Sequence, residues 1–218
     1  MARLRKQALR AITRKTLDHY ERNADDFWEG TRDHDVSQNV DALLEALEGD
    51  GPHRILDLGC GPGRDLAALR ARGHDPTGLD GSARFVAMAQ AHTGVPVWHQ
   101  DFLELELPDA HFDGVFANAS LFHVPTQELP RVLGELFACL VPGGVLFASN
   151  PRGRNEEGWN GERYGAFHDF EAWSSVVRAA GFAPVRHYYR PQGVRREEQP
   201  WLATVWRRPT AGAAESSG

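Results

Sequence analysis

The chain has 218 residues, of which 41% are hydrophobic and 25% are charged, values ordinary for a globular protein with one core. Its formal net charge of −6 argues against a protein that binds duplex nucleic acid by neutralising phosphates. No apolar run is long enough to span a membrane, and the two cysteines are too few for a disulfide framework.

The N-terminus is basic but lacks the apolar segment of a secretory signal, so we expect a cytoplasmic protein. Residues 4–20 predict an amphipathic helix, because four residues recur at helical spacing: Leu9, Ile12, Thr16 and Tyr20. A polar and aromatic segment without a regular period follows over residues 20–38, and residues 40–47 predict a second short helix. We therefore expect a helical N-terminal segment over residues 1–50.

From residue 54 onward, short apolar runs alternate with amphipathic segments. The predicted strands are 54–58, 75–80, 95–101, 112–119 and 143–150, and the predicted helices are 63–73, 82–92, 127–140 and 169–181. This alternation is typical of an α/β fold with a doubly wound parallel sheet. Two further strands, 183–190 and 201–208, have no helix between them and should pair antiparallel. Residues 51–208 thus form one domain, followed by a disordered tail at 209–218.

The strongest motif is LDLGCGPGRDL, which follows the first predicted strand and contains Gly59 and Gly61. Glycines allow a tight turn and let backbone N–H groups approach a ligand. Asp80 ends the second strand, where a carboxylate can bind both hydroxyls of a ribose. Asp101 and Phe102 follow the third strand and suit the amino group and the flat face of adenine. The motif therefore indicates a nucleoside site.

The same motif argues against a dinucleotide. A dinucleotide fingerprint needs glycine at position 64, where Arg64 stands, and the carboxylate of Asp57 would sit badly beside a pyrophosphate. A ligand with an ammonium or sulfonium group suits Asp57 better. An NAD-linked oxidoreductase and a non-catalytic binding module remain the two rival classes.

The combination resembles the class I S-adenosylmethionine-dependent methyltransferases over residues 54–206. The resemblance implies a Rossmann-like, seven-stranded sheet with an antiparallel last strand. It implies S-adenosylmethionine as cofactor and S-adenosylhomocysteine as product. The implied cofactor site consists of Asp57, Gly59, Gly61, Asp80, Gly81, Ser82, Asp101, Phe102 and Asn118. We expect the N-terminal segment to close this site through Tyr20, Trp28 and Arg32, with Arg32 on the cofactor carboxylate.

The acceptor is expected to be a small metabolite. Adenine-N6 enzymes carry an Asn/Asp-Pro-Pro-aromatic tetrad after the fourth strand, and this chain reads ANASLFHVP there. Metal-dependent catechol-type enzymes need clustered acidic ligands at the strand ends, and the sequence offers no convincing set, so we predict no metal.

The stretch SNPRGRNEEGWNGERYGAFHD, residues 149–169, shows no hydrophobic period, and we interpret it as an irregular segment held in place to bind the substrate. Arg152 or Arg163 can clamp a carboxylate, and Trp159 and Tyr164 can form a flat wall for a ring. Hydrogen bonds to an amino acid can come from Asn155, Asn160 and His168. The alternative is that these aromatic residues only pack the segment onto the domain.

A narrower resemblance is to the C-terminal methyltransferase domain of ovothiol-biosynthesis enzymes. It rests on residues 83–94, 97–108, 112–125, 149–169 and 187–209, and on DHDVSQN and GPGRDL. It implies methylation of the side-chain imidazole nitrogen of 5-thiohistidine nearest the backbone, the pi position. A sulfoxide synthase would be a partner in the same pathway, and the chain would be a stand-alone enzyme or an excised domain.

This resemblance completes the predicted substrate site. The substrate-binding residues are Phe122, His123, Asn150, Arg152, Asn155, Trp159, Asn160, Arg163, Tyr164 and His168. Asn118, Tyr164 and His168 are the catalytic candidates, since each can fix the ring tautomer by bonding its far nitrogen. Another small amino acid or keto acid is the alternative substrate.

Overall fold

The elements of the chain are those of the computed structural model, which describes residues 3–210. The helices are α1 (Lys6–Arg22), α2 (Ala24–Thr31), α3 (Ser37–Leu44), α4 (Arg64–Ala71), α5 (Ala83–Thr93), α6 (Leu129–Cys139) and α7 (Phe170–Ala179). The strands are β1 (Arg54–Leu58), β2 (Asp75–Asp80), β3 (Val97–His99), β4 (Phe112–Asn118), β5 (Leu140–Pro151), β6 (Glu156–Asn160), β7 (Arg163–Phe167), β8 (Ala183–Arg190) and β9 (Trp201–Arg207). Three short 3-10 helices occupy Phe102–Glu104, Leu121–His123 and Arg196–Glu198.

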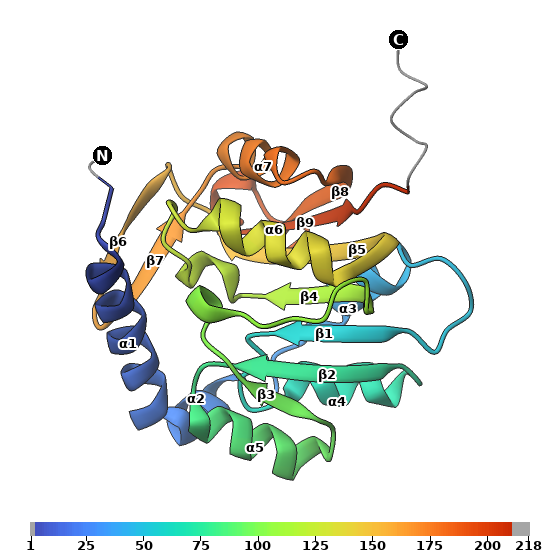
Figure 1. Ribbon diagram of the computed structural model, residues 1–218, viewed down its shortest axis with the longest axis horizontal. Coiled ribbons are helices and arrows are strands. Elements are labelled where there is room, and N and C mark those ends of the chain that lie inside the picture. Colours follow the sequence, from blue (N-terminus) through green and yellow to red (C-terminus); the bar gives the residue numbers. More distant parts are fainter. Residues whose placement is uncertain (1–2, 211–218) are drawn as a thin grey trace.

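The central sheet has seven strands in the order β3-β2-β1-β4-β5-β9-β8 (Figure 1). The five strands from β3 to β5 pair in parallel, whereas β9 is antiparallel to both β5 and β8. This confirms the predicted doubly wound sheet with an antiparallel last strand. The chain order reverses at β1 and β4, and ligands of such sheets bind at the carboxyl ends of the strands near this point.

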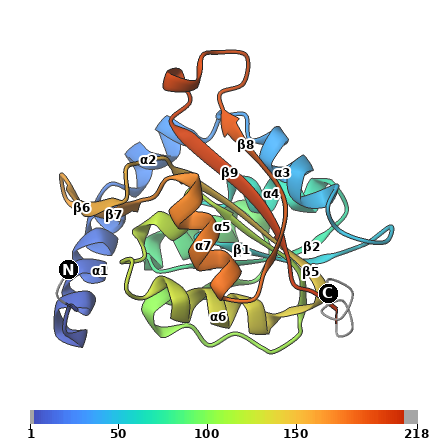
Figure 2. The same cartoon turned by 90° about the horizontal axis from the view of Figure 1, so that it is seen from above.

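Both faces of the sheet are covered by helices because successive residues of each strand point to opposite faces. In β1, Leu56 and Leu58 pack in the cluster that contains α6 and α7, while Ile55 packs in the cluster that contains α3 and α4. Figure 2 shows α6 and α7 on one side of the sheet and α3 on the other. The buried strands read as continuous apolar runs for this reason.

Helix α5 shows how the sequence sets its own boundaries. The hydroxyl of Ser82 accepts a hydrogen bond from the backbone N–H of Phe85 at 3.2 Å, so Ser82 is the N-cap of this helix. The helix ends at Gly94, which adopts a left-handed φ of 68°. These two residues place the start of α5 directly after the end of β2, beside the glycine loop.

The N-terminal segment contains one helix more than predicted. Helix α2 occupies part of the stretch to which we assigned no period, and within it Ala24 is fully buried. Phe27 of α2 packs against Tyr20 and Phe85, with ring centroids 5.6 and 5.2 Å apart. An eight-residue helix with few apolar positions gives too short a pattern for periodicity to detect.

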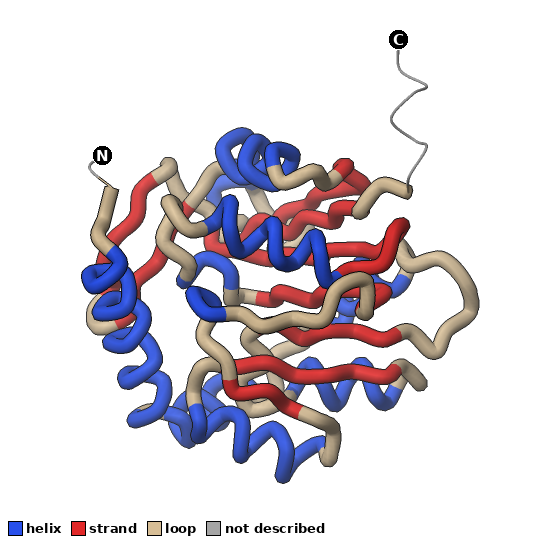
Figure 3. The backbone as a smooth tube through the Cα atoms, viewed as in Figure 1, coloured by secondary structure: helices blue, strands red, loops and turns tan. Residues whose placement is uncertain are grey.

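The prediction of an irregular segment at residues 149–169 is wrong. β5 continues to Pro151, and β6 and β7 form an antiparallel hairpin in which Asn160 pairs with Arg163. The two connecting residues are Gly161 and Glu162, and Gly161 has a φ of 62°. A positive φ at the first connecting residue alone is typical of a type II′ turn, for which glycine is the required residue. Figure 3 shows this hairpin alongside α1.

The predicted disordered tail, residues 209–218, lies outside the described residues from position 211 onward. Between residues 3 and 210, no helix combines the length and the hydrophobicity that crossing a membrane requires.

Candidate active site

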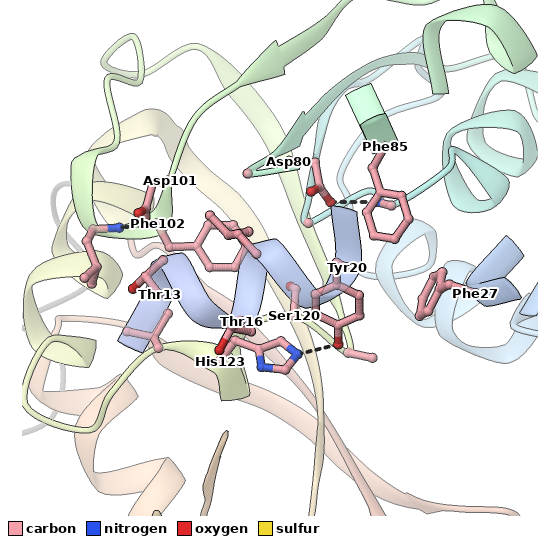
Figure 4. A pocket seen from close by; sticks show the side chains of 17 residues that line it. Thr13, Thr16, Tyr20, Phe27, Asp80, Phe85, Asp101, Phe102, Ser120 and His123 are labelled. Atoms are coloured by element: carbon pink, nitrogen blue, oxygen red, sulfur yellow. Dashed lines mark hydrogen bonds between the residues drawn. The ribbon is translucent and has the colours of Figure 1, made fainter. Parts of the chain in front are cut away.

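Two adjoining cavities lie at the carboxyl ends of the parallel strands. The glycine-loop cavity, about 710 Å³ with its open mouth, lies between Gly59, Gly61, Asp80 and Asp101 on the sheet side and α1 on the other (Figure 4). The outer cavity, about 1550 Å³ with its open mouth, lies between α2, the ends of β4 and β5, the start of β7 and the β8–β9 connection. The two cavities adjoin, since both are lined by Tyr20, Phe27, Gly59, Gly61 and Ala119.

The glycine loop can adopt its path only with glycine at position 59. Gly59 has a φ of 76°, and an added Cβ would lie 2.5 Å from the Cβ of Ser120. The backbone N–H of Gly59 donates to the carbonyl of Leu79 at 2.7 Å, and that of Gly61 donates to Asp80 Oδ2 at 2.9 Å. The loop thus joins the ends of β1 and β2 and presents bare backbone to the cavity.

Asp80 is held rigidly at the base of the glycine-loop cavity. Its Oδ1 accepts from the backbone N–H of Ser82 at 2.9 Å, and its Oδ2 accepts from Gly61. Burial raises the pKa of Asp80 to about 6, against the pull of these two hydrogen bonds. Each carboxylate oxygen retains a lone pair that can accept from a hydroxyl.

Asp57 lies beneath the loop and lines neither cavity. Its side chain is 1% exposed, and its Oδ2 has no hydrogen-bond partner within the described part of the chain. Burial, followed by the charge of Asp65, raises the pKa of Asp57 well above its usual value. Asp57 therefore affects the electrostatic field beneath the loop and does not contact a ligand in the cavity.

The glycine-loop cavity suits a cationic nucleoside. Two carboxylates, Asp80 and Asp101, face it, and its described lining contains neither lysine nor arginine. Oδ1 of Asp101 accepts from the backbone N–H of Leu103 at 2.8 Å, and burial raises the pKa of Asp101. Phe102 beside it offers a flat apolar face. Carboxylates at both ends, an apolar wall and a glycine cradle fit a sulfonium nucleoside.

Helix α1 closes the glycine-loop cavity from outside. Thr13, Thr16, Leu17 and Tyr20 of α1 line it. Leu17 packs so closely on Gly81 that a Cβ there would lie 2.7 Å from the leucine side chain. The hydroxyl of Thr16 accepts from the backbone N–H of Tyr164 at 3.0 Å, which ties α1 to β7.

A buried hydrogen-bond chain fixes the tautomer of His123. Its Nδ1 lies 2.6 Å from the carbonyl oxygen of Tyr164, which can only accept, so Nδ1 carries the proton. Its Nε2 then accepts from the hydroxyl of Tyr20 at 2.8 Å. Burial lowers the pKa of His123 to about 4 and raises the pKa of Tyr20, whose rise the nearby Arg163 opposes. Both side chains are therefore neutral at pH 7, and Tyr20 is anchored at the junction of the two cavities.

A second polar chain fixes Asn118 in the outer cavity. Asn118 Nδ2 donates to Asp65 Oδ2 at 2.9 Å, and Asn118 Oδ1 accepts from Asn39 Nδ2 at 2.9 Å. Arg64 pairs with the same Asp65 through two hydrogen bonds of 2.7 and 3.0 Å. One N–H of Asn118 remains free to donate into the cavity.

The structure brings 12 of the 22 predicted site residues to these cavities. The predicted residues that line one or both are Tyr20, Trp28, Gly59, Gly61, Asp80, Gly81, Asp101, Phe102, Asn118, Phe122, His123 and Arg163. Most of them lie at strand ends, where the sheet topology concentrates them.

The other predicted residues line neither cavity. Arg32 pairs with Glu29 and Asp33, and Arg152 donates to the carbonyl of Arg196 at 3.0 Å. The remaining predicted residues that line neither cavity are Asp57, Ser82, Asn150, Asn155, Trp159, Asn160, Tyr164 and His168.

Several of these have structural contacts on the hairpin. Asn155 bonds Asp169 at 2.8 Å, and Lys15 lies 4.4 Å above the ring of Trp159, which is 46% exposed. Tyr164 reaches the site through its backbone. His168 Nε2 lies 3.4 Å from the Thr126 hydroxyl.

Several lining residues were not predicted. They are chiefly Thr13, Thr16, Leu17, Phe27, Arg64, Asp65, Arg190 and Trp201. Arg190 ends β8 and Trp201 begins the antiparallel β9, so both lie at the carboxyl edge of the parallel strands. Applying the strand-end rule to this pair would have found them.

Comparison with known proteins agrees with the fold and the glycine loop. Residues 55–144 match the family described as methyltransferase domain. An uncharacterized methyltransferase of Mycobacterium tuberculosis is 38% identical over 111 residues, which is 50% of this chain and 55% of that protein. The chain thus spans little more than half the length of these mycobacterial relatives.

A longer match is the trans-aconitate 2-methyltransferase of Paracidovorax citrulli, 31% identical over 184 residues, or 79% of this chain and 68% of that protein. Among solved structures, Burkholderia thailandensis 1,6-didemethyltoxoflavin-N1-methyltransferase with bound S-adenosylhomocysteine has a TM-score of 0.75 and 22% identity. That match covers 96% of this chain and 92% of the other, and it shows the shared fold. With the sheet order, the glycine loop and the longer relative in agreement, the chain belongs to the class I S-adenosylmethionine-dependent methyltransferases.

Proposed function

We propose that the protein methylates the side-chain imidazole nitrogen of 5-thiohistidine at the pi position, the last step in the formation of ovothiol A. One observation carries the proposal most directly. Arg163, predicted to clamp a carboxylate, lines the outer cavity together with Phe122 and Trp28. Arg163 forms no ion pair with a carboxylate anywhere in residues 3–210. A guanidinium without an ion-pair partner, in a cavity that aromatic side chains also line, suits an amino acid with a flat side chain.

The cofactor supplies, when bound, a sulfonium methyl group that is open to attack by a nucleophile. We assign its ribose to Asp80, its adenine to Asp101 and Phe102, and its amino-acid end to the glycine loop. In this proposal the N-terminal segment covers the cofactor, since α1 forms one wall of the cavity. Enclosure strengthens each polar contact because water is excluded.

Orientation decides which atom of 5-thiohistidine reacts. The substrate carries a sulfur that is intrinsically the better nucleophile, so the site must direct the ring nitrogen toward the cofactor. Holding two reactants in the productive geometry can lower a barrier by roughly 7–11 kcal/mol. We assign the substrate carboxylate to Arg163 and the ring to the face of Phe122. The far ring N–H is assigned to Asn118 Oδ1, which accepts from it and so leaves the lone pair on the pi nitrogen.

No residue needs to act as a strong base in this scheme. The pi nitrogen can present its own lone pair, and the nitrogens of His123 are already engaged by Tyr20 and Tyr164. His123 therefore acts as a support for Tyr20 rather than as a proton acceptor. Tyr164 and His168, which line neither cavity, are weaker catalytic candidates than Asn118.

The alternative function is methylation of another small amino acid or keto acid. The relatives named as trans-aconitate 2-methyltransferases support a substrate with carboxylate groups. Arg163 would serve such an acid equally well. In the favoured proposal, a sulfoxide synthase makes the substrate upstream, and both enzymes work in the cytoplasm.

A direct assay separates these possibilities. The protein is incubated with S-adenosylmethionine and, in parallel, with 5-thiohistidine, histidine, ergothioneine or trans-aconitate. The position of any new methyl group is then located by NMR. We expect a methyl group on the pi nitrogen of 5-thiohistidine; turnover of trans-aconitate with none of 5-thiohistidine would replace this function by the alternative.

A further inference from the structure

Two arginines of the outer cavity come from different parts of the fold. Arg163 begins β7 in the hairpin, and Arg190 ends β8 in the central sheet. The guanidinium of Arg163 lies 5.9 Å from the centroid of the Tyr20 ring, at the junction with the glycine-loop cavity. Arg190 donates to the backbone carbonyl of Asp35 at 3.0 Å, and Asp35 lines only the outer cavity. Relative to the glycine-loop cavity, Arg163 therefore lies at the near end of the outer cavity and Arg190 at its far end.

Both guanidinium groups have binding capacity left. Within residues 3–210, neither has a carboxylate oxygen at ion-pair distance, whereas the third arginine of the cavity, Arg64, is paired with Asp65. The carboxylate of Asp35 lies near Arg190, but it accepts from the backbone N–H of Ser37 at 2.9 Å. An arginine has five N–H donors, so a single backbone carbonyl leaves most of Arg190 open. The cavity is thus prepared for two anionic groups.

We propose that Arg163 and Arg190 bind the two anionic groups of one substrate, and that Arg190 binds the thiolate of 5-thiohistidine. This proposal rests on the function proposed above and deepens it. In 5-thiohistidine the sulfur and the pi nitrogen stand on opposite sides of the ring carbon that carries the side chain. When the pi nitrogen faces the glycine-loop cavity, the sulfur points toward the far end, where Arg190 lies. The carboxylate of the substrate is then bound by Arg163.

This arrangement accounts for the choice of nitrogen over sulfur. A neighbouring cation favours the thiolate over the thiol, and hydrogen bonds from Arg190 occupy the sulfur lone pairs. The pi nitrogen supplies the electron pair of the new nitrogen–carbon bond, while the pair of the broken carbon–sulfur bond leaves with S-adenosylhomocysteine. The positive charge gained by the ring is balanced by the thiolate, so the product needs no proton removed.

The test uses the variants Arg190→Gln and Arg163→Gln in the full chain, with Arg154→Gln as control. Arg154 is exposed and lines neither cavity. The S-adenosylhomocysteine-loaded proteins are titrated calorimetrically with 5-thiohistidine, with histidine, which lacks the sulfur, and with decarboxylated 5-thiohistidine. Affinity for S-adenosylhomocysteine itself verifies that each variant is folded.

The expected pattern is specific to each arginine. Arg190→Gln weakens 5-thiohistidine binding by about 10- to 100-fold, the value of one charge-assisted interaction, and leaves histidine binding unchanged. Arg163→Gln weakens both amino acids and leaves the decarboxylated analogue unchanged. In turnover, Arg190→Gln moves part of the methyl product from nitrogen to sulfur, which NMR detects and a general loss of stability would not cause.

The two proposals fail in different ways. If the wild-type protein binds 5-thiohistidine and Arg190→Gln weakens histidine equally, the thiolate assignment is overturned while the function stands. If the wild-type protein binds trans-aconitate instead, with both arginines required, the thiolate assignment is overturned together with the proposed function, and a site for two carboxylates takes its place.

Discussion

Replacing Tyr20 by phenylalanine tests whether α1 is part of the cofactor site. The change removes one hydroxyl from the junction of the two cavities and keeps the ring, which packs on Phe27 and Phe85. The lost contact is the 2.8 Å hydrogen bond to His123 Nε2. Because His123 Nδ1 stays bound to the carbonyl of Tyr164, the ring cannot turn to find another partner for Nε2 without breaking that bond.

The size of the expected loss of cofactor affinity follows from the burial of His123. Leaving a buried acceptor without a partner costs about 1–3 kcal/mol. The penalty applies only while α1 is closed, since an open α1 would expose Nε2 to water. If closure is needed to hold the cofactor, the dissociation constant of S-adenosylhomocysteine rises by about 5- to 150-fold.

Isothermal titration calorimetry with S-adenosylhomocysteine measures this change. Tyr189→Phe is the matched control, because Tyr189 lines neither cavity, and its affinity should equal that of the wild type. In a double-mutant cycle, His123→Ala and Tyr20→Phe should couple by about 0.5–3 kcal/mol. A Tyr20→Phe variant that unfolds at a lower temperature yet binds with wild-type affinity would show that the contact stabilises the fold without serving the cofactor.

Two further predictions concern the glycine loop and its carboxylate. Gly59→Ala should destabilise the protein by about 2–5 kcal/mol in urea unfolding, because the added Cβ meets Ser120 at 2.5 Å and the φ of 76° is strained for alanine. Its matched control, Gly134→Ala, should stabilise the protein by about 0.5–1 kcal/mol, since Gly134 lies inside α6 with no atom within 4 Å of the new Cβ. For Asp80, whose pKa is raised to about 6, the carboxylate prevails above that pH and the neutral acid below it. The dissociation constant of S-adenosylhomocysteine should therefore rise as pH falls through about 6, by at most tenfold per unit, and calorimetry of Asp80→Asn should show weak binding without this dependence. A pH-independent wild type would contradict the ribose assignment.

Sequence patterns were sufficient for the sheet and for the residues at its strand ends. The run ending at Leu58 is largely apolar because β1 is buried on both faces, and this gives a strong signal. Glycine is needed directly after this strand for a local steric reason, since a side chain would not fit the turn of the loop. Asp80 and Asp101 follow directly, since parallel strands bring their carboxyl ends to one edge. Each of these inferences depends on neighbours in sequence or on one rule of topology.

The hairpin was missed for a different physical reason. β6 is exposed along most of its length, so its side chains show no alternation between apolar and polar residues. Its order depends on contacts from distant elements, such as the bond from Tyr164 to Thr16 and the pairing of Glu162 with Arg22. The one local signal was the two-residue connection that begins with Gly161.

These long-range contacts also explain why the lining of the outer cavity was harder to predict than that of the glycine-loop cavity. Glu162 accepts from Arg22 of α1 at 2.9 Å, and its neighbour Arg163 faces the outer cavity. Tyr20, two residues before Arg22, faces the glycine-loop cavity. A contact between α1 and the hairpin thus sets the positions of a residue on each side of the junction. We therefore expect Arg163 to shift if α1 moves to admit the cofactor, which would couple binding at the outer cavity to the position of α1.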